Sequence, residues 1–460
     1  MKKYLFFFLI GFISCKKDSF EINTNIQKTT QNISYEFSGY KVNVTDLTIS
    51  KLKNNGREYW KNTQILPDLI VRKFQKPYGD KSNYGTFYYG ITAGDFNKDG
   101  YIDVFNGGVL YNGIKALPKF LIWDSQTKIF EEQNLFNQQI ENLGNPTKVV
   151  SLYINDDDYV DLVCFSYIDE GLSNPKLYKL VELLSDGKGK YDVVELTTET
   201  PIFYHNGGDV GDLNGDKFPD LVVNCGGLMS ILWGIKSFPY FNESNPAIFS
   251  IPIVNLNSTT FYSYHNNNGF YESVPEIVDR YVWNSSIVDV NKDGWNDLIF
   301  SSVEDTSSNS HNYNKIILNL GNGRFNKNSI INLPFNNNKS NNMDYIVDDI
   351  NGDNLNDIIT SVDLGNQDWK FYIYYQNKNG SFTLDKNSFI TSKLTINYKD
   401  YKPHIIYFDF NGDGQKDITY IDGADNGQQI NKTVFIRKGN QFIEEDFYQY
   451  DVYAKTSLKN

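Results

Sequence analysis

The sequence predicts an all-β fold made from a repeated unit of about sixty residues. Six segments are variants of one nine-residue pattern, they recur at nearly constant spacing, and short apolar runs lie between them and the next turn residues. A period in this range is typical of propellers and other arrays. We therefore expect one supersecondary unit to be copied along the chain.

The repeated pattern is a loop rich in Asp and Asn. The six segments read DFNKDGYID, YINDDDYVD, DLNGDKFPD, DVNKDGWND, DINGDNLND and DFNGDGQKD, and they begin at Asp95, Tyr153, Asp212, Asp289, Asp349 and Asp409. Their starts differ by 58, 59, 77, 60 and 60 residues. Five segments carry Asp at positions one, five and nine and Asn at position three. We call these five the complete loops, and residues 153–161 the degenerate segment.

The composition of the complete loops predicts calcium binding. Ca²⁺ takes about six to eight oxygen ligands, and acids at alternate positions of a short loop can turn every second side chain toward one point. We expect the side chains at positions one, three, five and nine to bind the ion, together with the carbonyl at position seven. The predicted ligands are Asp95, Asn97, Asp99, Tyr101, Asp103, Asp212, Asn214, Asp216, Phe218, Asp220, Asp289, Asn291, Asp293, Trp295, Asp297, Asp349, Asn351, Asp353, Leu355, Asp357, Asp409, Asn411, Asp413, Gln415 and Asp417.

Position six of each loop should form a sharp turn, which favours glycine. Gly100, Gly294 and Gly414 satisfy this expectation, whereas Lys217 and Asn354 stand there in the other two complete loops. Asn tolerates positive φ well and Lys less so. We therefore expect weaker binding in the loop that contains Lys217.

The degenerate segment has lost its first acid and carries Asp158 at the turn position. Asn155, Asp157 and Asp161 remain as weak candidate metal ligands. We expect this segment to be empty or to bind calcium weakly.

Two other interpretations of the loops are less consistent with the sequence. A single Asp-Asn-Gly cluster is usually a turn, but repetition at a fixed period favours a metal loop. An EF-hand would need flanking helices and a Glu at position twelve. The complete loops have no Glu there, and their flanks are β-rich runs such as DLIFSS and DIITSV, so we expect the loops to join strands.

These segments resemble the calcium loops of FG-GAP and VCBS repeats, the units of integrin-α-type β-propellers. The resemblance covers roughly residues 87–447, and it includes a second hairpin with a Gly-Asn-Gly-x-Phe turn, matched by NLGNGRF and loosely by NKNGSF and RKGNQF. Two hairpins per unit imply a four-stranded blade. Six blades can be counted, and residues 32–86 supply either a seventh blade or a closing strand such as Leu66–Phe74.

The amino terminus predicts export and lipid anchoring. Lys2 and Lys3 precede a short apolar stretch, which suits a signal peptide over residues 1–14 and is too short to span a membrane. The run FISC resembles a bacterial lipobox, with Phe12 in place of the usual Leu and Cys15 as the lipidated residue. Residues 15–31 would then be the lipidated end and a polar tether, and residues 448–460 a C-terminal tail. We expect an outer-membrane or cell-surface location, with periplasmic and secreted locations as alternatives.

The charge and the cysteines fit this interpretation. The formal charge is −13, and the five complete loops alone hold fifteen Asp, so the acidity is largely that of the predicted metal sites. It argues against a nucleic-acid partner, which would favour a basic face. Cys164 and Cys225 are expected to be small buried side chains, with a disulfide between them as the less favoured alternative.

The widest interval between loops locates an insertion of roughly eighteen residues within 236–282. This stretch is rich in aromatic residues and Asn, and Tyr240, Tyr262, Tyr264 and His265 are candidate ligand-binding residues. Aromatic faces with nearby amides can stack on sugar rings, and long loops often carry function. The alternative is an Ω-loop that packs on itself.

Catalytic signals are few. The chain has four His and lacks the HExxH, GxSxG, P-loop and CxxC motifs, so we assign no catalytic residue. We expect a calcium-stabilised surface protein that binds an extracellular glycan or protein and touches the membrane only through its lipid anchor. The alternatives are a calcium-dependent polysaccharide lyase or hydrolase and a structural subunit of an outer-membrane assembly.

Overall fold

In a computed structural model the chain divides into two compact units, Met1–Asn32 and Ile33–Asn460. All described residues belong to the second unit. The predicted signal peptide, Cys15, the tether and the C-terminal tail all lie outside the described residues. With short gaps, the described residues are 90–167, 180–196, 205–250, 280–304, 312–363, 369–385, 404–421 and 433–446, with isolated strands at 34–37, 40–43, 48–51, 262–264 and 390–391.

Six antiparallel sheets make up most of the described structure, which confirms the all-β prediction. We number them 1 to 6 in chain order. The strands of sheets 1 to 3 are β4 (Ile91–Gly94), β5 (Asp103–Asn106), β8 (Lys119–Asp124) and β9 (Ile129–Gln133); β10 (Asn145–Leu152), β11 (Asp161–Tyr167), β12 (Leu180–Ser185) and β13 (Tyr191–Leu196); and β14 (His205–Gly211), β15 (Asp220–Cys225), β16 (Leu228–Gly234), β17 (Phe241–Ser250) and β18 (Tyr262–Tyr264). The strands of sheets 4 to 6 are β19 (Arg280–Val288), β20 (Asp297–Glu304), β21 (Asn312–Ile317) and β22 (Ile330–Asn332); β23 (Asn342–Asp348), β24 (Asp357–Asp363), β25 (Trp369–Gln376), β26 (Phe382–Leu384) and β27 (Ile390–Thr391); and β28 (His404–Phe408), β29 (Asp417–Ile421), β30 (Thr433–Lys438) and β31 (Gln441–Asp446).

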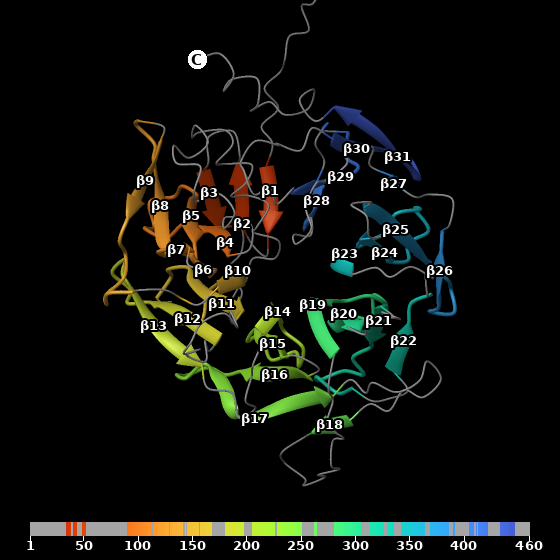
Figure 1. Ribbon diagram of the computed structural model, residues 1–460, viewed down its shortest axis with the longest axis horizontal. Helices are drawn as coiled ribbons and strands as arrows, with labels where there is room; N and C mark the ends of the chain where they lie inside the picture. Colours follow the sequence, from red (N-terminus) through yellow and green to blue (C-terminus); the bar gives the residue numbers. More distant parts are fainter. Residues whose placement is uncertain are drawn as a thin grey trace, which may run out of the picture. The chain divides into compact units, whose positions relative to one another are not determined.

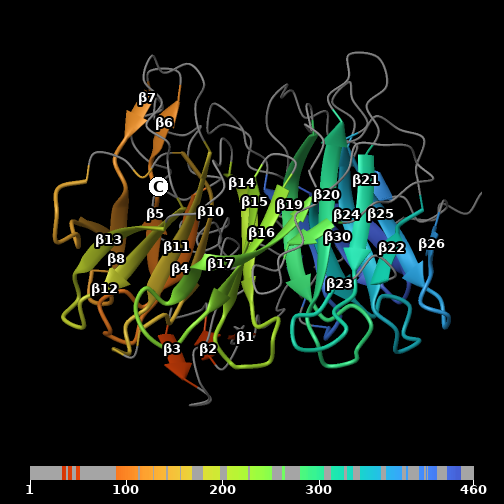
Figure 2. The same cartoon turned by 90° about the horizontal axis from the view of Figure 1, so that it is seen from below.

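Two smaller sheets complete the topology. Strands β1 (Ser34–Phe37), β2 (Tyr40–Asn43) and β3 (Thr48–Lys51) form a three-stranded antiparallel sheet within residues 32–86, for which the sequence predicts a seventh blade or a closing strand. Strands β6 (Val109–Tyr111) and β7 (Ile114–Ala116) form a hairpin that extends beyond the end of sheet 1 in Figure 2. The suggested closing strand at residues 66–74 lies outside the described residues.

The strands of each of the six sheets pair in chain order as a meander, except that β27 pairs with β25 in sheet 5. The predicted second hairpins are present in sheets 4, 5 and 6, as β21–β22, β25–β26 and β30–β31. In sheet 3 part of the insertion forms β18, which adds a fifth strand beside β17. Among the described residues, no helix is long and apolar enough to cross a membrane.

Successive sheets pack on each other through their first strands. Strand β4 contacts β10, β10 contacts β14, β14 contacts β19, β19 contacts β23, and β23 contacts β28. These strands are labelled in Figure 1. Asp209 on β14 illustrates the contact, because its carboxylate accepts from Lys148 Nζ on β10 at 3.0 Å and from the Ile287 N–H on β19 at 2.7 Å. One buried acid therefore joins three consecutive sheets.

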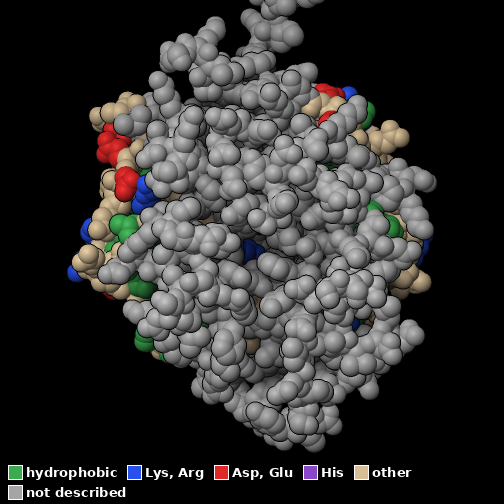
Figure 3. Space-filling view, in the orientation of Figure 1, with side chains coloured by type: hydrophobic (Ala, Val, Ile, Leu, Met, Phe, Trp, Pro, Cys, Tyr) green, Lys and Arg blue, Asp and Glu red, His purple; other side chains and the backbone are tan. Residues whose placement is uncertain are grey.

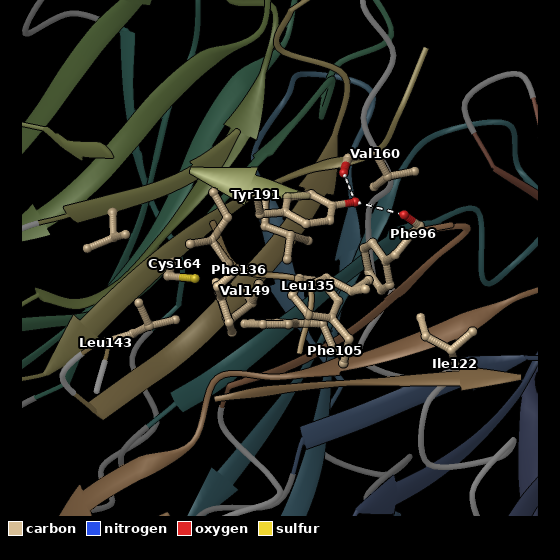
Figure 4. Packing of buried hydrophobic residues seen from close by; sticks show 14 residues of the cluster. Phe96, Phe105, Ile122, Leu135, Phe136, Leu143, Val149, Val160, Cys164 and Tyr191 are labelled. Carbon is tan, nitrogen blue, oxygen red and sulfur yellow. Dashed lines mark hydrogen bonds between the residues drawn. The ribbon is translucent and has the colours of Figure 1, made fainter. Parts of the chain in front are cut away.

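Apolar side chains fill the space between neighbouring sheets. One cluster lies between sheets 1 and 2 and includes Phe96, Phe120 and Tyr191, whose rings are fully buried (Figure 4). The rings of Phe120 and Tyr191 stack with centroids 4.8 Å apart. The aromatic richness of the sequence is thus used to join one sheet to the next.

Charged side chains lie at the outer hairpins. Lys119 and Glu132 pair at 2.9 Å across β8 and β9, and Lys438 and Glu445 pair at 3.1 Å across β30 and β31. Acidic and basic side chains gather over the same two hairpins in Figure 3. Such exposed pairs contribute little to stability, so the sheets are held mainly by their apolar interfaces.

Candidate metal centre

The nine-residue segment occupies the same place in all six sheets. It connects the first strand to the second, and its position nine is the first residue of the second strand in every case. The prediction that the loops join strands is therefore confirmed. Repetition of the sequence corresponds to repetition of one local structure.

In the loop that begins at Asp95, the polar side chains at positions one, three and five turn toward the same backbone. The Asp95 carboxylate accepts from the N–H groups of Asp99 and Gly100, both at 3.0 Å. Asn97 accepts from the Asp99 N–H at 3.1 Å and donates to the Asp99 carboxylate at 2.8 Å. Side-chain oxygens from three alternate positions are thus gathered inside one turn.

The other complete loops repeat these contacts. In all five, the Asn at position three donates to the Asp at position five over 2.8–3.1 Å. In the four loops whose first residue is described, the position-one carboxylate accepts from the N–H at position six over 2.8–3.0 Å. Asp409, Phe410 and Gly412 of the last loop lie outside the described residues.

The turn at position six is left-handed in every segment, as predicted. Gly100 has φ of 87°, and the non-glycine residues Lys217 and Asn354 both have φ of 71°. Position four is also left-handed in the four segments where it is described, which the sequence did not predict: Lys98 has φ of 62° and Lys292 has φ of 59°. The alternation of Gly with Lys at position four was the available signal, because Gly is the residue most tolerant of this conformation.

The Asp at position nine has a structural role that the sequence argument missed. All six of these side chains are fully buried. One carboxylate oxygen accepts from an N–H at or just after the third strand of the same sheet, over 2.8–2.9 Å, in all six sheets. The other accepts from the N–H at position two over 2.7–2.9 Å in the five segments where that residue is described. Position nine therefore fastens the loop to the sheet.

Burial and mutual repulsion raise the pKa values of these carboxyl groups. Burial raises the pKa of Asp220 to about 8 and that of Asp297 to about 7, and the negative charges at positions five and one of the same loop act in the same direction. Burial likewise raises the pKa of Asp95 to about 6, with repulsion from Asp99 adding to the rise. Carboxylates crowded in this way favour a proton or a cation among them.

The donor set fits calcium in chemistry. Carboxylate, amide and carbonyl oxygens are the ligands of a hard ion, and soft sulfur or imidazole ligands are absent from the described loops. Among the described residues, no three His, Cys, Asp or Glu side chains are grouped so that they could hold a metal ion as they stand. The carboxylates at positions one and five are hydrogen-bonded to the loop backbone and would have to turn toward the ion.

The degenerate segment keeps the contacts of the position-nine Asp and lacks the acid at position one. Asp161 is fully buried and accepts from the N–H groups of Ile154 at 2.7 Å and Ser185 at 2.8 Å. Tyr153, which replaces the acid at position one, packs against the core cluster between sheets 1 and 2. Asn155 donates to the Ser185 carbonyl instead of to Asp157, while its side-chain oxygen still accepts from the Asp157 N–H at 3.2 Å, as in the complete loops.

Of the candidate ligand-binding residues of the insertion, only Tyr240 has its side chain in the described part of the structure. Tyr240 lies in the β16–β17 turn with φ of 59° and packs against a core cluster. Tyr262 and Tyr264 belong to β18, and His265 lies outside the described residues. The exposed aromatic residue of this turn is instead Phe238, which is 63% exposed and meets the Tyr240 ring edge-on at 5.9 Å.

Cys164 is a free thiol, fully buried in β11 within an apolar cluster. Burial holds its pKa well above the usual range. It therefore behaves as the small buried side chain that the sequence predicts.

Comparison with known families identifies part of this array. A model described as an FG-GAP-like repeat matches residues 289–360 and again residues 349–420. The matched residues contain the complete loops that begin at Asp289, Asp349 and Asp409. The chain thus contains FG-GAP-like repeats in sheets 4 to 6. No curated protein that was searched matches the chain.

Proposed function

We propose that this chain is a calcium-stabilised β-propeller that is lipid-anchored at the outer membrane or cell surface and binds an extracellular glycan or protein. The observation that carries the proposal is the repeated loop: oxygens from positions one, three and five are gathered in the same turn of sheets 1, 3, 4 and 5. Calcium bound there would neutralise the crowded carboxylates. It would stiffen the edge of each sheet without taking part in chemistry.

The topology supports a radial array of blades. Six sheets meander in chain order, and each contacts the next through its first strand, which is the arrangement that radial repetition requires. The three-stranded sheet of β1, β2 and β3 comes from the segment for which six and seven blades were both open. We propose that it contributes the seventh blade.

The β16–β17 turn supports a binding role. The turn is closed by backbone hydrogen bonds from Ile235 N to the Tyr240 carbonyl at 2.6 Å and from Tyr240 N to the Ser237 carbonyl at 2.9 Å. It therefore presents Phe238 to solvent on a defined support. An exposed aromatic face of this kind can stack on a sugar ring or insert into a protein partner.

Affinity electrophoresis through gels that contain a panel of polysaccharides tests the glycan role. We expect retardation in at least one gel in the presence of calcium and its loss in Phe238→Ala. The matched control is Leu117→Ala, which removes an exposed apolar side chain elsewhere. Wild-type migration unaffected by every polysaccharide would contradict glycan binding, and co-purification of a stoichiometric protein would then identify the protein role.

Lipid anchoring at Cys15 is tested separately. We expect detergent-phase partitioning of the native product and accumulation of the precursor when globomycin blocks lipoprotein processing. Cys15→Ser should abolish both effects. A wild-type product that stays in the aqueous phase and is processed in the presence of globomycin would contradict the anchor.

A further inference from the structure

Neighbouring complete loops are hydrogen-bonded to each other through position eight. Asn296 donates its side-chain amide to the carbonyl of Asp212 at 2.9 Å, and Asn356 donates in the same way to the carbonyl of Asp289 at 2.9 Å. In both cases position eight of one loop binds position one of the preceding loop. Each donor also precedes the buried position-nine Asp of its own loop.

The loops of sheets 3 and 4 are also in van der Waals contact. A Cβ atom placed on Gly215 would lie 2.7 Å from Cζ3 of Trp295, so the indole of one loop rests on the backbone of the other. Asn319 bridges the same pair, because its amide donates to the Leu213 carbonyl at 2.7 Å and to the Asn296 carbonyl at 2.9 Å. The backbone of one loop therefore cannot shift without disturbing the next.

The junction between sheets 5 and 6 achieves a similar link with a different residue. Arg437 Nη2 donates to the Ile350 carbonyl at 2.6 Å and to the Asp349 carbonyl at 3.3 Å. The Arg437 N–H donates to the position-nine carboxylate of Asp417 at 2.8 Å. One residue thus connects positions one and two of one loop with position nine of the next.

An equivalent bridge joins the Asp95 loop to the degenerate segment. The Tyr191 hydroxyl donates to the carbonyls of Phe96 at 3.3 Å and Val160 at 2.9 Å (Figure 4). Because Tyr153 replaces the acid at position one, this bridge leads to a segment without a complete ligand set. This bridge therefore links the Asp95 loop to the degenerate segment and not to another complete loop.

We propose that Asn296, Asn356 and Arg437 are positioning residues through which the loops beginning at Asp212, Asp289, Asp349 and Asp409 fill with calcium cooperatively. The proposal rests on calcium binding by these loops. An ion that orders position one of a loop fixes the carbonyl to which the next loop is bonded, so the next loop loses less conformational freedom when its own ion binds. The Asp95 loop is expected to fill independently.

Calcium titration of the full-length chain by isothermal calorimetry and equilibrium dialysis tests this coupling. We expect a Hill coefficient above 1 for wild type. In Asn356→Ala the stoichiometry should be unchanged, the Hill coefficient should fall, and calcium should bind about fivefold more weakly at the coupled loops. Asn356→Gln keeps the amide donor, so its Hill coefficient should lie between those of Asn356→Ala and wild type.

The matched control is Asn379→Ala, which removes an exposed amide from the β25–β26 turn and should leave the titration unchanged. Melting of Asn356→Ala and Asn379→Ala in EGTA measures the structural cost of each change, including the lost Asn356–Asp289 hydrogen bond, separately from its effect on the calcium titration. The coupling would be overturned, with calcium binding intact, if wild type bound calcium at several sites with a Hill coefficient of 1. It would also be overturned if Asn356→Ala had the same Hill coefficient as wild type. Absence of bound calcium would overturn both.

Discussion

The loop that begins at Asp95 and the degenerate segment that begins at Tyr153 lie in neighbouring sheets and share one backbone plan. Each leaves the first strand, turns left-handed at position six, and ends on a fully buried Asp bonded to the third strand. They differ at position one, where an acid in the first is a core-packing Tyr in the second. The loop shape therefore survives the loss of the first acid.

This difference distinguishes a structural role of position nine from a proposed metal-binding role of position one. Position nine belongs to the architecture, because both of its oxygens satisfy backbone N–H groups in both segments. Position one belongs to the proposed metal site, because its carboxylate lies against the exposed turn and is dispensable for folding of the segment. Substitutions at the two positions should therefore have different consequences.

The largest effect is expected from Asp297→Ala, measured by urea unfolding in EGTA. This change leaves the buried N–H groups of Val290 and Asn319 without their partner and should lower the free energy of unfolding by about 2–5 kcal/mol. The matched variant Asp289→Ala removes only exposed contacts and should cost less than about 1 kcal/mol. Equal losses in the two variants would remove the distinction between the positions.

A smaller effect is expected from pH in the absence of calcium. The folded-state pKa values of Asp161, Asp220 and Asp297 are raised to about 7, 8 and 7, above their values in the unfolded chain. Their stabilising contribution is therefore present at low pH and is lost as the pH rises through about 7 to 8.

We accordingly expect the melting temperature in EGTA to rise by several degrees when the pH is lowered from 8.5 to 6. Calcium binding requires the charged carboxylates, so saturating calcium should weaken or reverse this dependence. A melting temperature in EGTA that falls over the same range would contradict the assignment of buried, mutually repelling carboxylates.

The smallest change is expected from restoring the missing acid in Tyr153→Asp. Calcium bound at equilibrium should increase by about one ion per chain, with stabilisation on the order of 1 kcal/mol when free calcium is about tenfold above the dissociation constant. The loss of the Tyr153 contact with the core will offset part of this gain. Tyr153→Asn is the matched control without the charge, and an unchanged calcium content in Tyr153→Asp would show that position one alone does not limit the degenerate segment.

The sequence was sufficient to predict features that depend on local spacing. The all-β fold, the join between strands and the left-handed turn at Lys217 follow from residues close together in the chain. The fastening role of position nine depends on N–H groups about twenty residues away, such as that of Trp123 for Asp103, and no local pattern identifies such a partner. One clue was present: the degenerate segment keeps Asp161 although it has lost its first acid.

The insertion shows the same limit. Its existence follows from the interval between loops, but the spacing does not show how far each aromatic ring is exposed, and Tyr240 is half-buried against a core cluster. Phe238, two residues earlier, is the exposed ring. Which aromatic residue of a turn faces solvent depends on backbone hydrogen bonds that spacing alone does not reveal.

The central proposal is that the complete loops bind calcium, and equilibrium dialysis of the full-length chain combined with thermal unfolding tests it most directly. We expect about five calcium ions per chain, one for each complete loop, and a melting temperature that EGTA lowers and added calcium restores. A chain that binds no calcium and melts at the same temperature with and without EGTA would contradict the proposal.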